Sequence, residues 1–267
     1  MPVDNYESVL WKTSRKMCIF TCSRMEDIMK VQAVTDVGRE RSVNQDYIYY
    51  SLTEIGSLPN LFLVADGMGG HKAGDMASRY TVETFVSLVK ESTEKDPISI
   101  INHAVTKVNE MLLDKAKESA DYEGMGTTLV VATIYNQVLK VANVGDSRLY
   151  ILGNDITQIT RDHSLVEEMV ALGEINREQA RHHEKKNIIT RAIGGYKTVE
   201  AEMFSVDLKP DDKILICSDG LSNMVEDSEI LKTVRMSGDI DTAAERLVEL
   251  ANENGGKDNI TVMIIEP

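Results

Sequence analysis

LFLVADGMGG, residues 61–70, joins a fully apolar run to an acidic, glycine-rich turn. The run 61–65 has the length and the apolar character of a buried β-strand. Asp66 follows it directly, so its carboxylate is held by a rigid element at a place that solvent can reach. Gly67 has no side chain, which lets its backbone carbonyl or a bound ion approach closely. This stretch therefore predicts a ligand position at the tip of a buried strand.

Three further aspartates lie in comparable places. Asp219 follows the apolar run 213–217, and Asp146 lies in a turn between two strand-like runs. Asp258 comes just before the last apolar run. Asp-Gly is the commonest turn dipeptide, so a single site of this kind is consistent with a simple turn. Converging carboxylates repel one another, however, and a set of them persists only where cations neutralise it. All-oxygen ligands indicate hard ions, Mg²⁺ or Mn²⁺, rather than zinc or copper.

The spacing of the glycines argues against two other phosphate-binding motifs. Gly67 and Gly69 begin a dinucleotide-binding pattern, but its third glycine position is Lys72. The segment around Lys197 ends like a Walker loop, but Tyr196 stands where that motif has glycine. Neither a nucleotide-binding strand–turn–helix nor a P-loop is therefore predicted.

The composition is that of a globular protein with an excess of acid. The chain has 267 residues, 42% of them hydrophobic, and a formal net charge of −14. That charge argues against nucleic acid or an anionic membrane as the main partner. Three cysteines are too few for a disulfide framework. No run approaches the roughly 18 apolar residues of a membrane span, and the N-terminus lacks a signal peptide. We therefore expect a cytoplasmic protein.

The patterned sequence begins at Met29. Residues 1–28 lack clear periodicity, and we expect either a poorly ordered extension or the product of an upstream start codon. Residues 29–267 then form one domain, because no low-complexity linker interrupts them. Strand patterns occur at 30–35, 46–52, 61–65, 213–217 and 260–265, and helical patterns at 73–90, 98–112 and 241–252.

Three more β-rich runs lie in the middle of the chain. The runs 128–135, 138–144 and 148–152 are separated by very short turns, which predicts an antiparallel meander. Residues 154–200 are polar and broken, with short helical pieces. Strands mostly in hairpins and helices in two blocks predict an α+β fold in which sheets are stacked between helices.

Several short motifs resemble those of bacterial PP2C-type (PPM family) protein phosphatases, in the same order along the chain. The match covers about residues 29–265, and the number of ordered motifs makes it specific. The motifs are Thr35-Asp36-Val37-Gly38, Arg41-Ser42-Val43-Asn44-Gln45-Asp46, Val64-Ala65-Asp66-Gly67-Met68-Gly69-Gly70-His71, Gly126-Thr127-Thr128, Gly145-Asp146-Ser147-Arg148, Asp162-His163-Ser164, Ile189-Thr190-Arg191-Ala192-Ile193-Gly194, Cys217-Ser218-Asp219-Gly220-Leu221 and Asp258-Asn259-Ile260-Thr261.

The resemblance implies a four-layer α-β-β-α sandwich, with two mainly antiparallel sheets flanked by helix pairs, and a metal site. By motif position, Asp66 bridges two Mn²⁺ or Mg²⁺ ions, with the Gly67 carbonyl and Asp46 completing one side. Asp219 and Asp258 hold the other ion. The resemblance further implies that residues 154–200 form a mobile flap beside the site.

The same resemblance implies two more site positions and an activity. Asp146, together with Asp219, matches the position that supports a third, weaker metal ion in bacterial members. Arg41 matches the arginine that grips the substrate phosphate, for which a guanidinium fork is suited. The implied reaction is hydrolysis of phosphoserine and phosphothreonine by a metal-activated water, in which Asp66 and Arg41 take part.

One position departs from part of the family. Eukaryotic members carry a histidine after the bridging Asp-Gly, and here that residue is Met68, which cannot donate a proton. The leaving-group acid stays open between water near Asp146, His71 and His163. The implied partners are phosphorylated proteins, including a cognate serine/threonine kinase and its substrates, and the implied state is a monomer. Two rival functions are a catalytically dead adaptor and a hydrolase of small phosphate esters.

Overall fold

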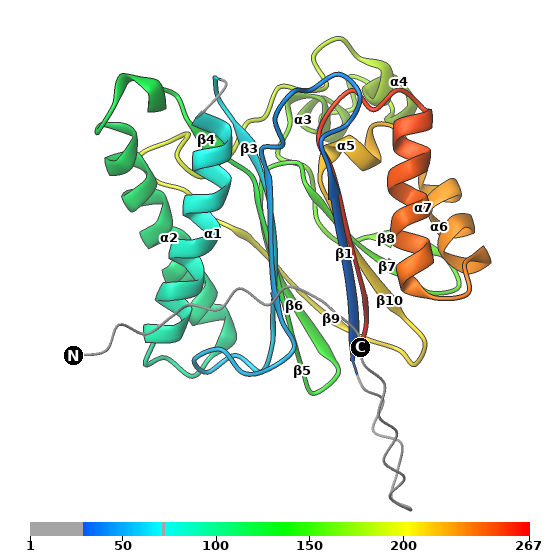
Figure 1. Ribbon diagram of the computed structural model, residues 1–267, viewed down its shortest axis with the longest axis horizontal. Helices are drawn as coiled ribbons and strands as arrows, with labels where there is room; N and C mark the ends of the chain where they lie inside the picture. The colour runs from blue at the N-terminus through cyan, green and yellow to red at the C-terminus, as the bar shows by residue number, and fades with distance from the viewer. Residues whose placement is uncertain (1–28, 71–72) are drawn as a thin grey trace, which may run out of the picture.

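Four layers make up the protein in the computed structural model, which describes residues 29–70 and 73–267 (Figure 1). Two sheets lie face to face at the centre, and a pair of helices covers the outer face of each sheet. The expected α+β sandwich is therefore confirmed. Residues 1–28 and His71 lie outside the described residues, so the expectations about the extension and about His71 stay untested.

One sheet, called here the β2 sheet, begins with the strand that starts at Asp46, the last residue of the motif at 41–46. Its strands run in the order β2-β3-β5-β6-β9, with β4 pairing to β3, and neighbouring strands are antiparallel. Their bounds are β2 (Asp46–Ser51), β3 (Leu61–Met68), β4 (Gly126–Thr127), β5 (Leu129–Tyr135), β6 (Val138–Val144) and β9 (Glu202–Asp207).

The other sheet, called here the β1 sheet, contains the C-terminal strand between its first and third members. Its order is β1-β11-β10-β7-β8, again with antiparallel neighbours. The bounds are β1 (Lys30–Asp36), β7 (Arg148–Leu152), β8 (Ile156–Gln158), β10 (Lys213–Cys217) and β11 (Ile260–Glu266).

The two helical layers pack against the outer faces of the sheets. Helices α1 (Ala73–Glu91) and α2 (Pro97–Ala116) cover the β2 sheet, and α6 (Asp227–Met236) and α7 (Ile240–Glu253) cover the β1 sheet. Asp96 caps α2 by accepting from the Ser99 backbone N–H at 2.9 Å, which satisfies one of the free donors at that end. None of the helices in the two described segments is long and apolar enough to cross a membrane.

Burial on both faces explains why the run at 61–65 is apolar throughout. Phe62 and Val64 point into the core between the two sheets, whereas Leu61, Leu63 and Ala65 pack under α1 and α2. Successive side chains of a strand point to opposite faces, so a strand covered on both sides needs apolar residues at every position. This packing fixes β3 rigidly and carries Asp66 at its far end.

The predicted meander is wrong in its third strand. β5 and β6 form the expected hairpin, but β7 pairs with β10 in the other sheet. The chain crosses between the sheets at Gly145, whose φ is +109° and whose added Cβ would lie 2.6 Å from Thr128. A short turn is compatible with a hairpin or with a crossover, and the choice depends on packing that the local pattern does not contain. The crossover places Asp146 between the sheets.

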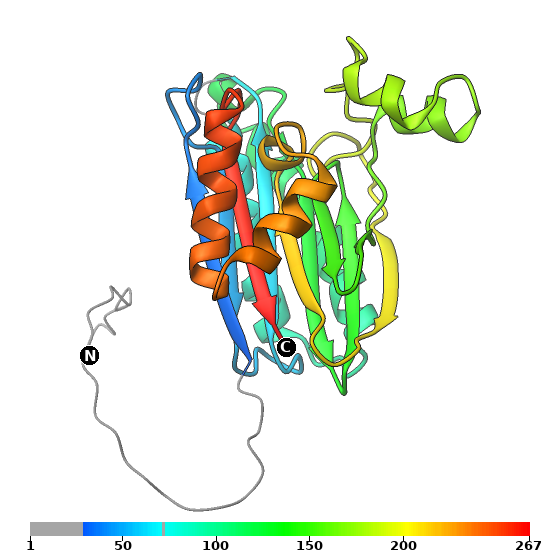
Figure 2. The same ribbon diagram turned by 90° about the vertical axis from the view of Figure 1, so that its right-hand side faces the viewer.

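β4, β9 and α6 are among the elements that lie outside the predicted ones. The segment predicted as broken contains β8, α3 (Leu165–Ala171) and α4 (Arg177–His182). Figure 2 shows α3 and α4 projecting from one end of the sandwich. That end also carries the turn at 145–147, because Gly145 bonds to His163 just before α3.

Candidate metal centre

Asp46 and Asp66 lie opposite each other on neighbouring strands of the β2 sheet. The Oδ2 atom of Asp46 accepts hydrogen bonds from Ser218 Oγ at 2.8 Å and from Thr261 Oγ1 at 2.6 Å. Ser218 follows β10 and Thr261 belongs to β11, so both donors come from the β1 sheet. The buried Asp46 carboxylate therefore bridges the two sheets at the end where β3 delivers Asp66.

Asp219 and Asp258 approach the same place from the β1 sheet. Asp219 begins α5 (Asp219–Ser222), and its Oδ2 accepts from Asn223 Nδ2 at 2.8 Å. Asp258 precedes β11, and its Oδ2 accepts from Arg41 Nη2 at 2.7 Å. Arg41 thus lies beside these aspartates, is half exposed, and contacts Asp258. The predicted phosphate-binding arginine and the predicted ligands are brought together.

Asp146 joins the cluster from the crossover between the sheets. Its neighbour Ser147 shares a hydrogen bond of 2.7 Å with Thr128, and the Gly145 backbone N–H donates to His163 Nδ1 at 3.0 Å. Asp146 is buried and lies near enough to Asp219 for their charges to repel. We refer below to the five residues Asp46, Asp66, Asp146, Asp219 and Asp258 as the acidic cluster.

Without bound cations, burial and mutual repulsion disfavour the ionised form of the carboxylates in the acidic cluster. Burial raises the pKa of Asp46 to about 7, against the effect of its two hydroxyl donors, and raises that of Asp219 to about 6. Burial also holds the pKa values of Asp66 and Asp146 well above their ordinary range, and repulsion from neighbouring carboxylates adds to the effect. A bound cation would offset both effects and lower these pKa values, because it favours the ionised carboxylate.

The donor atoms fit a hard divalent ion. Asp46 Oδ1, Asp146 Oδ1 and Asp219 Oδ1 are buried and accept no hydrogen bond from the residues that the structure describes. Buried carboxylate oxygens are normally paired, so a ligand explains these three. Within the described segments, no three carboxylate, imidazole or thiol side chains are placed to hold one ion by themselves. A backbone carbonyl such as that of Gly67 and water would therefore have to complete the ligands of an ion here, as they commonly do for Mg²⁺ and Mn²⁺.

Known proteins match this chain in sequence and in fold. The family model described as protein phosphatase 2C matches residues 37–261. The chain belongs to the protein phosphatase 2C family. The serine/threonine phosphatase stp of Listeria innocua is 39% identical over 243 residues, which cover 89% of this chain and 96% of that protein.

Solved structures resemble this phosphatase domain closely. The serine/threonine phosphatase Stp1 from Staphylococcus aureus gives a TM-score of 0.84 at 34% identity, covering 93% of this chain and 99% of its own. The catalytic domain of the phosphatase PstP, in complex with 2 manganese ions, gives a TM-score of 0.78 at 33% identity, covering 89% and 97%.

The candidates for a leaving-group acid in this phosphatase differ in their surroundings. His163 is nearly buried, and its Nδ1 accepts from Gly145 while its Nε2 lies 3.2 Å from Glu202. Because both ring nitrogens have protein partners, the structure favours a positioning role for His163. Met68 ends β3 and has its sulfur near Gly126, without a proton to give.

Several site residues received no role from the sequence. Ser218 and Thr261 hold Asp46, and Asn223 holds Asp219. Their only sequence signal is that Ser218 and Thr261 lie in motifs that contain a predicted ligand. Hydroxyl and amide side chains are common on any surface, so this signal does not separate them from other polar residues.

Metal binding by the acidic cluster is expected to raise the melting temperature of the phosphatase, and more so at high pH. In the metal-free protein, the folded state keeps protons on Asp46 and Asp219 up to about pH 6–7, whereas the unfolded state loses them near 3.8. Stability from these groups is therefore fullest below about pH 4 and falls as the pH rises toward 7. Bound Mn²⁺ removes that loss.

Differential scanning fluorimetry with EDTA or with excess Mn²⁺ checks this. We expect Mn²⁺ to raise the melting temperature by about 5 °C or more at about pH 8, and by less at about pH 5. An ion effect of equal size at both pH values, or none at all, would contradict the assignment of these carboxylates.

Proposed function

We propose that this chain is a metal-dependent phosphatase that hydrolyses phosphoserine and phosphothreonine esters in proteins. The observation that carries the proposal is the acidic cluster, in which aspartates from both sheets meet with three buried, unpartnered oxygens. Family membership and relatives named serine/threonine phosphatases support the same reaction. The adaptor alternative is disfavoured, because every predicted ligand position retains its aspartate.

In this proposal the acidic cluster holds two Mn²⁺ or Mg²⁺ ions. The charges of Asp46, Asp146, Asp219 and Asp258 all act on Asp66, which suits a bridging position. Asp219 and Asp258 take the second ion, and Asp146 with Asp219 supports a third, weaker one. When bound, such ions lower the pKa of water and neutralise charge on a phosphate ester.

The protein's own contribution is positioning. Ser218 and Thr261 fix one oxygen of Asp46, so its other oxygen is directed to the ion with little conformational freedom. Arg41 contacts Asp258 through one Nη atom, and its remaining donors can grip two phosphate oxygens. We propose that Arg41 binds phosphate beside the acidic cluster, and that stabilisation of the equatorial oxygens makes a covalent intermediate unnecessary.

The setting of the enzyme is also a proposal. We infer a cytoplasmic monomer that acts on phosphorylated proteins, including a cognate serine/threonine kinase and that kinase's substrates. The phosphatase domain spans 29–267, and the segment 154–200, which contains α3 and α4, serves as a flap that controls access to the acidic cluster.

Hydrolysis of matched phosphopeptides tests the proposed function. With added Mn²⁺, the phosphothreonine peptide should be turned over at least about 100-fold more efficiently than its phosphotyrosine counterpart, and EDTA should abolish the activity. The readout is released phosphate. Turnover of small esters such as p-nitrophenyl phosphate without turnover of phosphopeptides would favour the small-ester alternative. Metal-dependent binding of phosphoproteins without turnover would favour the adaptor.

A further inference from the structure

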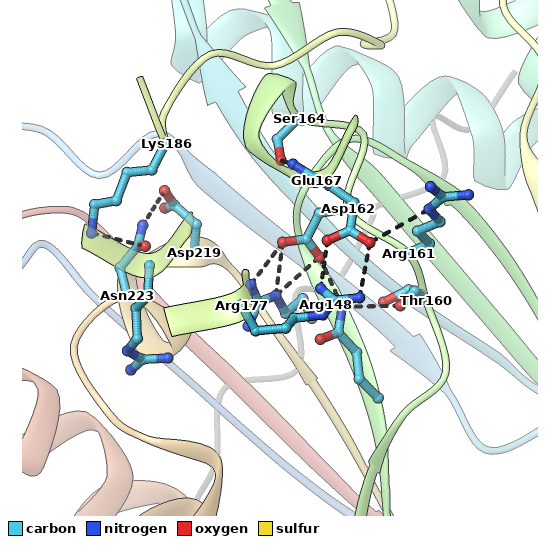
Figure 3. Close-up of polar contacts among 12 residues, drawn as sticks. Arg148, Thr160, Arg161, Asp162, Ser164, Glu167, Arg177, Lys186, Asp219 and Asn223 are labelled. Carbon is cyan, nitrogen blue, oxygen red and sulfur yellow. Dashed lines mark hydrogen bonds and ion pairs between the residues drawn. The ribbon is translucent and has the colours of Figure 1, made fainter. Parts of the chain in front are cut away.

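A cavity of about 610 Å³ extends from the acidic cluster toward α3 and α4. Asp146 and Asp219 form its inner end, α4 and the residues after it form one wall, and the segment 222–228 forms the other. Figure 3 shows polar contacts among residues that line the cavity, including Arg148, Lys186 and Asp219. The proposed reaction gives a role to Asp146 and Asp219 but to no other side chain that lines the cavity.

Most charged side chains lining the cavity neutralise each other. Arg148 pairs with Asp162 at 2.7 Å, and Arg177 pairs with Glu167 at 2.5 Å. Arg181 pairs with Glu226 at 2.6 Å. Asp146 and Asp219 are the carboxylates that the proposed ions would neutralise. These arginines therefore serve mainly to hold the walls together and are committed to their carboxylates.

Lys186 is the exception among the lining cations. Within the described part of the chain, its ammonium has no carboxylate within ion-pairing distance and donates to Asn223 Oδ1 at 3.2 Å. Asn223 in turn donates to Asp219 Oδ2 at 2.8 Å (Figure 3). An ammonium has three N–H donors, so two remain for a ligand. Lys186 is thus a half-buried cation held one residue away from a proposed metal ligand.

The backbone around Lys186 is fixed on the cavity wall. Its N–H donates to the His183 carbonyl at 3.2 Å, and the Ile188 carbonyl accepts from Leu165 at the start of α3 at 2.9 Å. Burial lowers the pKa of Lys186, and the nearby charge of Asp219 partly offsets this. A long side chain that is partly desolvated and not ion-paired costs stability, which indicates a role in binding.

We propose that Lys186 is a substrate-positioning residue that binds an anionic group of the phosphorylated substrate beside the acidic cluster. Arg41 reaches the cluster through Asp258, and Lys186 reaches it through Asn223 and Asp219. Arg41 and Lys186 belong to different segments of the chain, and a substrate phosphate held at the acidic cluster would contact both side chains. The anionic group is either the scissile phosphate or an acidic side chain of a flanking residue. This inference rests on the proposed phosphatase function.

Steady-state kinetics on three substrates test the proposal. They are p-nitrophenyl phosphate, a phosphothreonine peptide with alanine flanks, and the same peptide with glutamate flanks. We expect Lys186→Ala to raise KM about tenfold for the glutamate-flanked peptide, which matches one lost charge-assisted hydrogen bond. Lys186→Arg should stay within about threefold of the wild type, because it keeps the charge and the reach.

The pattern across substrates identifies the anion. A rise in KM for all three substrates supports contact with the scissile phosphate, and a rise confined to the glutamate-flanked peptide supports a flanking carboxylate. Unchanged KM on every substrate, or a loss in kcat alone, would overturn the proposal. So would an arginine variant as impaired as the alanine variant, because a purely structural defect is not rescued by charge.

The neighbouring Lys185→Ala is the matched control. Lys185 is exposed and does not line the cavity, but its removal changes the net charge equally. It should leave KM within about twofold for all three substrates. An equal rise in KM for Lys185→Ala would show a general charge effect and overturn the proposal. A wild-type enzyme that does not hydrolyse the peptides would instead refute the proposed function.

Discussion

Asp66→Asn is expected to lower kcat for a phosphothreonine peptide by about 10³-fold or more, the largest effect that we expect from one substitution. Asparagine keeps the shape of the side chain but removes the negative charge from the centre of the acidic cluster. The ions proposed to be shared across the two sheets then lose their common ligand. Initial rates of phosphate release with saturating Mn²⁺ measure the effect.

The melting temperature shows whether the loss of activity comes from the missing charge or from misfolding. Because burial raises the pKa of Asp66, a neutral side chain should leave the melting temperature of the metal-free protein equal to or above that of the wild type. The shift produced by Mn²⁺ should shrink at the same time. Asp114→Asn, at an exposed position of α2, is the matched control and should change neither quantity. Turnover retained by Asp66→Asn would remove Asp66 from the mechanism.

Gly220→Ala is expected to lower the free energy of unfolding by about 3 kcal/mol or more. A Cβ at this position would lie 2.0 Å from the carbonyl oxygen of Asn259, which is backbone and has little room to move. Asn259 also donates to the carbonyls of Val37 and Val43, so displacing it disturbs the loop that carries Arg41. Urea denaturation in EDTA measures the change without any contribution from metal.

Gly238→Ala is the matched control for that substitution. A Cβ at Gly238 has no heavy atom within 4 Å, so the change should stay within about 1 kcal/mol and could be stabilising. Similar losses for the two variants would show that the close contact at Gly220 relaxes at little cost.

The parts of the fold that were predictable depend on local patterns. The stripe of Ile101, Val105, Val108 and Leu112 identified α2, and its members are buried against the β2 sheet. Positions next to apolar strands identified Asp66, Asp146, Asp219 and Asp258, whereas Asp46 was identified only through the family resemblance. The partner of β7 could not be predicted, because its alternation is the same in either sheet. β9 is a partly exposed edge strand, which weakens the apolar pattern that identifies strands.

The acidic cluster could be predicted only as a set of separate positions. The bonds from Ser218 and Thr261 to Asp46 join residues 172 and 215 positions apart, so they exist only once both sheets have formed. Lys186 lies in a polar segment without periodicity, and only its distance to Asn223 separates it from Lys185. The local sequence indicated which side chains were available to bind metal or phosphate, and tertiary packing decided which of them lie together in the site.

The crossover at Gly145 has a thermodynamic consequence for the whole molecule. Because the acids are divided between the two sheets, an ion that they share would act as a cross-link between layers that also touch through apolar side chains and through the hydrogen bonds from Ser218 and Thr261 to Asp46. Separation of the sheets at that end must then be accompanied by release of the ion. The cooperativity of unfolding is thereby tied to the free concentration of divalent cation.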